Sequence, residues 1–132
     1  MDKKQAWLQL VREKSEHYLN LHDGGFDEKM QARLVDCDYE AQTVTYAFPT
    51  QTWQINEKGG IHGGAIAGMF DTAFGVVANF TAGDNEATTT DMTVSFLRGV
   101  DLGMELHLKV FIVKAGRSLI SQRAELTDAA TG

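Results

Sequence analysis

One carboxylate stands inside the longest stretch of the sequence that carries almost no charge. Between Ile61 and Phe80 the only formal charge belongs to Asp71. Burying an isolated carboxylate is costly, so Asp71 should either lie in a wet cleft or bind its proton unusually tightly. Both conditions are typical of a general base, and the alternative is a structural aspartate that caps a neighbouring element. Asp71 is therefore the first candidate for catalysis.

A glycine-rich run opens this stretch. Residues 59–64, GGIHGG, place flexible backbone where the first amides of a helix lack hydrogen-bond partners. Such a helix start can bind a developing oxyanion. Phosphate loops are the competing interpretation, but the sequence contains neither GxGxxG after a strand nor GxxxxGK followed by serine or threonine. Nucleotide binding is therefore disfavoured.

Other catalytic centres are also disfavoured. His62 precedes Asp71 by nine residues, but no serine or cysteine lies in a nucleophile-elbow pattern, so a hydrolase triad is not expected. The four histidines are far apart on unlike elements, and we expect no metal. The single cysteine, Cys37, rules out an intramolecular disulfide and is typical of a reducing cytosol. We expect it to act as a small buried hydrophobe rather than as a reactive thiol.

Periodicity predicts the elements that hold these residues. Residues 3–20 have apolar side chains at helical spacing, and the DGG run at 23–25 should end that helix. Residues 61–80 are apolar on all sides, which predicts a central helix wrapped by a sheet. Alternating apolar residues predict strands over 30–34, 43–48, 92–96, 104–112 and 119–127, the last two forming a hairpin. The fold class is α+β, with one antiparallel sheet around one long helix.

A strip of the smallest side chains runs along the central helix, and Asp71 stands in its middle. Spacing of three and four residues places these side chains on one face: Gly64, Ala67, Gly68, Asp71, Gly75 and Ala78. Small residues let another backbone or a ligand come close. The glycines and the central aspartate also make this helix a poor membrane span.

Composition limits the classes of function. The 132 residues fit one domain, and a formal net charge of −6 disfavours nucleic acid as a partner. Arg12, Glu13 and Lys14 interrupt the first apolar stretch too early for a signal peptide, so we expect a cytoplasmic protein.

Two motifs carry a resemblance to a known family. The run NEKGGIHGG at 56–64, followed by DTAF at 71–74, resembles the signature of hotdog-fold acyl-CoA thioesterases of the phenylacetyl-CoA thioesterase (PaaI) type. The likeness extends over residues 25–131 and includes 89–98 and the turn at 114–117. It implies a hotdog domain over 25–132, preceded by an amphipathic helix over 1–24, and an acyl-CoA thioesterase activity.

The resemblance further implies an active site shared between two subunits of a homodimer or a dimer of dimers. Asn56 and the backbone amide of Gly63 would polarise the thioester carbonyl from one subunit. Asp71 of the other subunit would attack directly or activate water, helped by the hydroxyl of Thr89, with His62 as an orienting residue. The chemistry agrees, because a thiolate leaves readily and the reaction mainly needs a base and preorganised oxyanion donors.

Coenzyme A would enter as part of the substrate, without a separate cofactor. The candidate substrate-binding residues are Gly64, Arg98, Lys114 and Arg117, of which the three cations would hold the nucleotide end of coenzyme A or else be ordinary solvated side chains. Five large side chains either line an acyl tunnel or fill the core: Phe48, Trp53, Met69, Phe70 and Phe74.

The sequence departs from the family pattern at two places. Gly99 stands shortly after Arg98, where family members usually carry proline. The family pattern also continues beyond the turn at 131–132 into a final strand, which we expect to be absent here. Two other functions stay open, namely a non-catalytic acyl-CoA-binding hotdog module and a hotdog hydratase or dehydratase that would use the histidine as its base.

Overall fold

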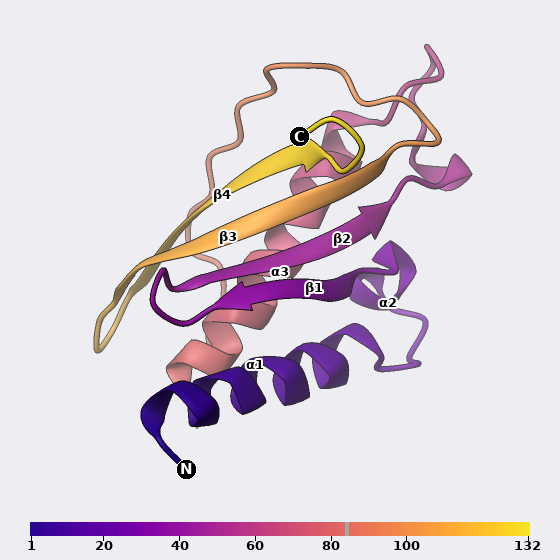
Figure 1. Ribbon diagram of the computed structural model, residues 1–132. Helices are drawn as coiled ribbons and strands as arrows, with labels where there is room; N and C mark the ends of the chain where they lie inside the picture. The colour runs from indigo at the N-terminus through magenta and orange to yellow at the C-terminus, as the bar shows by residue number, and fades with distance from the viewer. Residues whose placement is uncertain (84) are drawn as a thin grey trace.

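The computed structural model describes residues 1–83 and 85–132 (Figure 1). Its elements, in chain order, are α1 (Lys3–Leu19), α2 (Phe26–Met30), β1 (Arg33–Asp38), β2 (Thr43–Pro49), a 3-10 turn (Thr52–Gln54), α3 (Gly63–Ala82), β3 (Glu105–Ala115) and β4 (Ile120–Asp128). The four strands form one antiparallel sheet in the order β1-β2-β3-β4. Helix α3 crosses one face of this sheet, and α1 packs beside α3 and against β1 (Figure 1). The predicted α+β architecture is confirmed.

Helix α1 is set by its cap and by one buried stripe. Asp2 accepts a hydrogen bond from the Gln5 amide at 2.7 Å, which satisfies a free donor of the first turn. Val11, Ser15 and Leu19 are buried on one face. The Ser15 hydroxyl is hydrogen-bonded to the Tyr46 hydroxyl at 2.7 Å, and burial raises the pKa of Tyr46 above its ordinary value. The helix covers the predicted span to within one residue.

The core lies between α3 and the two central strands. Leu106, Leu108 and Val110 of β3 are at most 2% exposed, and Met69 of α3 and Phe48 of β2, the strand partner of Leu106, are fully buried. Full burial of one such side chain contributes about 1.5–3 kcal/mol. Phe48 and Met69 are therefore core residues rather than lining residues of a tunnel. Cys37 on β1 is half-buried, and burial raises its thiol pKa more than the nearby Arg12 lowers it.

The prediction that α3 is buried all round is wrong for this chain. One stripe of α3, which includes Met69, Val76 and Phe80, is buried, while Gly64 and Asp71 are exposed. The reason is that a four-stranded sheet and α1 cover only part of the helix circumference. Among the described residues α3 is the one helix long and apolar enough to span a membrane, and here it packs as the core helix of the sheet.

The first strand begins later than the alternation indicates. Met30, which was expected to start a strand at 30–34, is instead the last residue of α2, and β1 begins at Arg33. Gln31 takes a left-handed conformation with φ of 54°, which ends α2 and breaks the period of two. Met30 is fully buried, as the apolar pattern predicts, but it belongs to a helix and not to a strand.

The strand expected over 92–96 is not formed. This segment has no regular secondary structure, and among the described residues it pairs with no strand. Its exposure alternates only as far as Ser95, because Met92 and Val94 are half-buried and Asp91, Thr93 and Ser95 are exposed, but Phe96 is exposed as well. Residues 92–96 thus have the sequence pattern of a strand but lack the hydrogen-bonded neighbouring strand that a sheet requires.

Two glycines of the small-residue strip have different structural roles, which gives a test of the packing. A Cβ atom at Gly68 would overlap the ring of Phe26 and approach Met30 Cε to 2.9 Å, whereas a Cβ at Gly75 would meet nothing within 4 Å. Gly68→Ala should therefore destabilise the chain by about 1–3 kcal/mol through overpacking. Gly75→Ala, the matched control, should stabilise it by up to about 1 kcal/mol through helix propensity. Urea unfolding measures both, and equal effects would contradict this packing.

Candidate functional site

The loop before α3 is shaped by Asn56. Its backbone amide donates to the carbonyl of Gly60 at 2.8 Å. Its side-chain oxygen accepts from the amides of Lys58 at 2.8 Å and Gly60 at 3.2 Å. Gly59 supplies the left-handed turn this loop needs, with φ of 86°. Because the side-chain oxygen holds the loop, the Asn56 NH₂ group is the part that remains to donate to a ligand, and it has no acceptor among the described residues.

Backbone contacts fix this loop to the chain that precedes β3. The amide of Ile61 donates to the carbonyl of Val100 at 2.8 Å, and Gly60 forms an antiparallel bridge with Asp101. On the other side the amide of His62 donates to the carbonyl of the buried Gln54 at 2.7 Å. The start of α3 is therefore held from both sides.

His62 caps α3 and leaves one amide free. Its Nδ1 atom accepts from the amide of Gly64 at 2.8 Å, and its carbonyl accepts from Ala65 at 3.0 Å and Ile66 at 3.1 Å. The amide of Gly63, the first residue of this 20-residue helix, has no acceptor in the described part of the chain. Gly63 is thus the donor available to a developing negative charge, at the positive end of the helix dipole.

The same cap explains Gly64. A Cβ atom there would lie 3.0 Å from Nδ1 of His62, so a larger residue would push the capping imidazole away. The Gly64 amide is also engaged by the cap. The position of the His62 side chain therefore requires glycine at residue 64. The Gly64 amide is not free to donate a hydrogen bond to a substrate.

An aromatic residue that sequence reasoning had not singled out covers the Gly63 end of the helix. The ring of Phe96 lies 3.6 Å from the position a Gly63 Cβ would take, and Phe96 itself is 55% exposed. The sequence signals were the alternation at 92–96, which placed Phe96 among apolar strand residues, and the family likeness over 89–98, which assigned it no role. Phe96 therefore places an apolar ring beside Gly63 at the start of α3.

Asp71 and Thr89 lie together. The Thr89 hydroxyl donates to Oδ1 of Asp71 at 2.7 Å, across eighteen residues of sequence. Asp71 is exposed on α3. Of the two environments expected for this carboxylate, the structure therefore has the solvent-accessible one. The neighbouring hydroxyls of Thr88 and Thr90 make no such contact with Asp71. The pair leaves the second oxygen of Asp71 free to accept a proton from water.

The oxyanion donor and the carboxylate are far apart within one chain. Asp71 lies eight residues after Gly63 on α3, which corresponds to about 12 Å along the helix axis. One scissile carbonyl contacts groups at roughly 3 Å. Gly63 and Asp71 of the same chain therefore cannot act on the same carbonyl.

The candidate cations are not gathered in one place either. Arg98, Lys114 and Arg117 are all exposed. Arg98 precedes β3, whereas Lys114 and Arg117 lie at the far end of β3 and in the turn after it. The eleven residues of β3 span about 35 Å. A single chain thus offers two separate positions for an anionic group.

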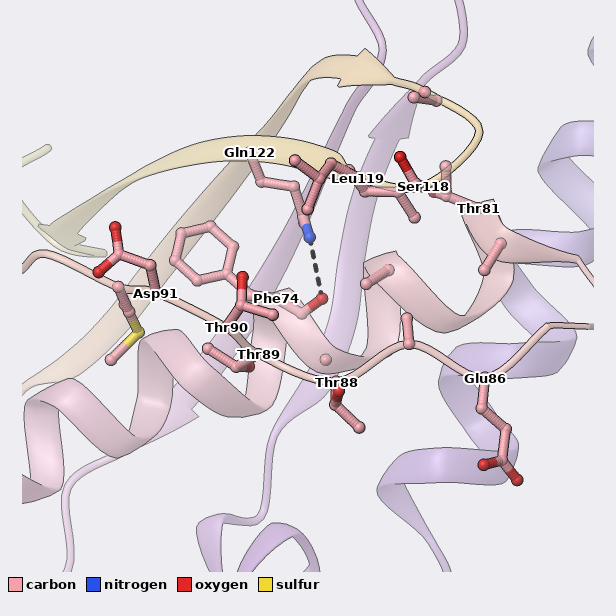
Figure 2. Close-up of a pocket in the computed structure, with 18 of the residues that line it drawn as sticks. Phe74, Thr81, Glu86, Thr88, Thr89, Thr90, Asp91, Ser118, Leu119 and Gln122 are labelled. Carbon is pink, nitrogen blue, oxygen red and sulfur yellow. Dashed lines mark hydrogen bonds between the residues drawn. The ribbon is translucent and has the colours of Figure 1, made fainter.

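A cavity of about 870 Å³ lies beside α3 (Figure 2). Phe70 and Phe74 of α3 line it, together with residues 85–93 and 115–120 and three side chains of β4. Trp53, in contrast, is 51% exposed on the loop after β2. No group of three or more metal-binding side chains occurs among the residues described by the structure.

The chain is similar to known thioesterases in sequence pattern and in fold. The thioesterase superfamily family model matches residues 58–132. None of the curated proteins compared with the chain matches it. Among solved structures, mouse thioesterase superfamily member 2 is 20% identical with a TM-score of 0.74, covering 99% of this chain and 90% of its own.

Two bacterial structures are also similar. The Escherichia coli PaaI protein from the phenylacetic acid degradation operon is 17% identical with a TM-score of 0.76, over 92% of this chain and 85% of that one. A hypothetical thioesterase from Streptococcus pneumoniae, solved with coenzyme A, is 18% identical with a TM-score of 0.66, over 75% and 74%. These likenesses confirm the hotdog fold.

Proposed function

Since the chain belongs to the thioesterase superfamily, we propose that it hydrolyses an acyl- or aryl-acyl-CoA thioester to the free acid and coenzyme A. The observation that carries the proposal is the placement of a free helix-end amide at Gly63 and a hydrogen-bonded carboxylate at Asp71. An oxyanion donor and a base are the two parts that thioester hydrolysis needs.

The active site forms between two copies of the chain. Because Gly63 and Asp71 lie about 12 Å apart on one helix, each must find its counterpart elsewhere. A two-fold axis that sets two α3 helices antiparallel would bring Gly63 of one copy towards Asp71 of the other, twice over. The functional unit is then a homodimer, or a dimer of dimers.

The chemistry follows from these positions. The carbonyl oxygen of the thioester lies against the Gly63 amide and the Asn56 NH₂ group, which stabilise the negative charge of the tetrahedral intermediate. Asp71, oriented by Thr89, takes a proton from the attacking water. When the C–S bond breaks, the thiolate of coenzyme A takes up that proton, and the acid is released. His62 positions Gly63 by capping the helix and does not itself act as the base.

Coenzyme A is a part of the substrate in this proposal. The chain carries a net charge of −6, so the phosphates must be met by individual cations. Arg98, Lys114 and Arg117 are exposed and available for that role. The coenzyme A in the S. pneumoniae structure supports this class of ligand.

The two other functions fit the geometry less well. A hydratase or dehydratase would need a histidine base, but Nδ1 of His62 is engaged in the helix cap. A pure binding module has no use for a carboxylate on the helix that is held by the hydroxyl of a residue lining the cavity. Release of free thiol from phenylacetyl-, benzoyl-, short- and medium-chain acyl-CoA tests the proposal, and binding without any thiol release would favour the module.

Mixing two inactive variants tests the shared site. Asp71→Asn and Gly63→Pro each disable both sites of their own homodimer. If the sites are shared, a mixed dimer has one intact site, and an equimolar mixture should recover about a quarter of wild-type activity. Thiol release after subunit exchange, followed with tagged chains, measures this recovery.

The matched control is Asp71→Asn mixed with the double variant Gly63→Pro/Asp71→Asn, which should recover nothing because every site lacks the carboxylate. Exchange without recovery in the first mixture would contradict a shared site.

A further inference from the structure

The loop before α3 contains a fully buried side-chain amide. Gln54, the last residue of the 3-10 turn, is 1% exposed, and no other glutamine or asparagine among the described residues is buried. Burying an amide is costly unless its hydrogen bonds are made. An apolar side chain of the same volume would fill this space without that cost, but it would make no directional contact. The contacts of Gln54 therefore show what its amide holds in place.

The Gln54 side chain links the 3-10 turn to helix α2. Its Oε1 atom accepts from the amide of Gln51 at 2.9 Å, and its Nε2 atom donates to Sδ of Met30 at 3.6 Å. Met30, the last residue of α2, is fully buried in the core. The Gln51 side chain adds a second link, since its Nε2 atom donates to the carbonyl of Lys29 at 2.7 Å. The two glutamines therefore fix the turn to the end of α2.

The backbone of Gln54 holds the residue that precedes the oxyanion donor. Its carbonyl accepts from the amide of His62 at 2.7 Å. The next peptide unit contains the His62 carbonyl and the Gly63 amide, which point in opposite directions because the peptide bond is planar and trans. The carbonyl accepts from Ala65 and Ile66 inside the helix, so the Gly63 amide points away from it. Glycine has no side chain to fix this direction, which therefore depends on how His62 is held.

We propose that Gln54 is a positioning residue for the oxyanion donor, because its buried amide fixes the His62 backbone and thereby the direction of the Gly63 amide. This inference rests on the proposed function, in which the Gly63 amide stabilises the tetrahedral intermediate. Gln54 does not contact the substrate and acts only through the position of its carbonyl. A displacement of about 1 Å in a reacting geometry can cost roughly 10²-fold in rate.

The test replaces Gln54 with methionine in two backgrounds. Methionine has a similar volume and keeps the backbone carbonyl, but it removes both side-chain hydrogen bonds. In the wild-type chain, Gln54→Met should lower kcat by about 10- to 100-fold with little change in KM. In the Gly63→Pro chain, which already lacks the donor, the same change should lower kcat no further. Thiol release from the acyl-CoA that the wild type hydrolyses fastest measures both effects.

The matched control is Ser15→Ala. Ser15 is also 1% exposed, and its hydroxyl is hydrogen-bonded to the Tyr46 hydroxyl, so alanine breaks a buried hydrogen bond on α1 instead of beside α3. Ser15→Ala should leave kcat unchanged, and urea unfolding compares the stability that each variant loses. Gln51→Met removes the side-chain link to Lys29 and serves as a milder second variant if Gln54→Met does not fold. It should lower kcat in the wild-type chain and not in the Gly63→Pro chain.

Hydrogen exchange of the His62 amide gives a readout that does not depend on activity. This amide should exchange at least about tenfold faster in Gln54→Met than in Ser15→Ala, because its acceptor is no longer held. Faster exchange in a chain that hydrolyses no thioester would contradict the proposed function and still support the anchoring of His62 by Gln54. Unchanged exchange at His62 would overturn the positioning role. A loss of kcat in the Gly63→Pro chain as large as in the wild type would overturn it as well, because Gln54 would then act on the fold in general.

Discussion

Asp71→Asn is expected to lower kcat for acyl-CoA hydrolysis by roughly 10²–10⁴-fold, the usual contribution of a positioned base. Asparagine keeps the size of the side chain and can still accept from Thr89, but it cannot take a proton from water. KM should change little, because Asp71 acts on the attacking water and not on coenzyme A. Thiol release under saturating substrate measures kcat directly.

The control for Asp71 is an aspartate of equal charge away from the site. Asp36 is exposed on β1, so Asp36→Asn removes the same charge and should leave kcat unchanged. Since Asp71 is exposed, the variant should unfold at the same urea concentration as the wild type. Turnover at the wild-type rate in Asp71→Asn would remove the carboxylate from the mechanism.

Gly63→Pro is expected to cost about 10²–10³ in kcat, the usual effect of deleting one oxyanion donor. Proline lacks the amide hydrogen but suits the first position of a helix. The preceding residue, His62, is already extended with φ of −61° and ψ of 137°, as a residue before proline requires. The Gly63 amide has no acceptor in the described chain, so folding loses no hydrogen bond there.

Gly63→Ala is the matched control. It keeps the amide, and its Cβ would meet the Phe96 ring at 3.6 Å, an ordinary van der Waals contact. Gly63→Ala should therefore retain most of the wild-type kcat, whereas Gly63→Pro loses about 10²–10³-fold, as measured by thiol release with unfolding monitored in parallel. Equal losses in the two variants would mean that crowding at Phe96, and not the donor, limits the rate.

Much of the architecture could be predicted from the sequence, because it depends on local periodicity. The α1 helix, the β3–β4 hairpin and the long helix after GGIHGG each follow from spacing that a single element satisfies by itself. The glycine-rich start of α3 is likewise local, since a helix always leaves its first amides free. These features needed no knowledge of distant neighbours.

Partners distant in the sequence decided the rest. Residues 92–96 have a strand pattern but form no strand, because a strand exists only beside a hydrogen-bonded neighbour. The family resemblance named Thr89 as the partner of Asp71, but the spacing of residues along the chain could not show this contact, nor that Phe96 lies beside Gly63. Which amide of the GGIHGG run stays free was decided by the imidazole of His62 turning back onto Gly64.

The sequence by itself determined the chemistry available, namely a lone carboxylate and a free helix start on one long apolar helix. Only the tertiary structure decided how these groups are used. The rise of an α-helix sets Gly63 and Asp71 about 12 Å apart, which calls for a second copy to complete the site. Contacts across the fold then give Asp71 its hydroxyl partner and Gly63 its apolar cover, because such contacts depend on how elements pack and not on spacing along the chain.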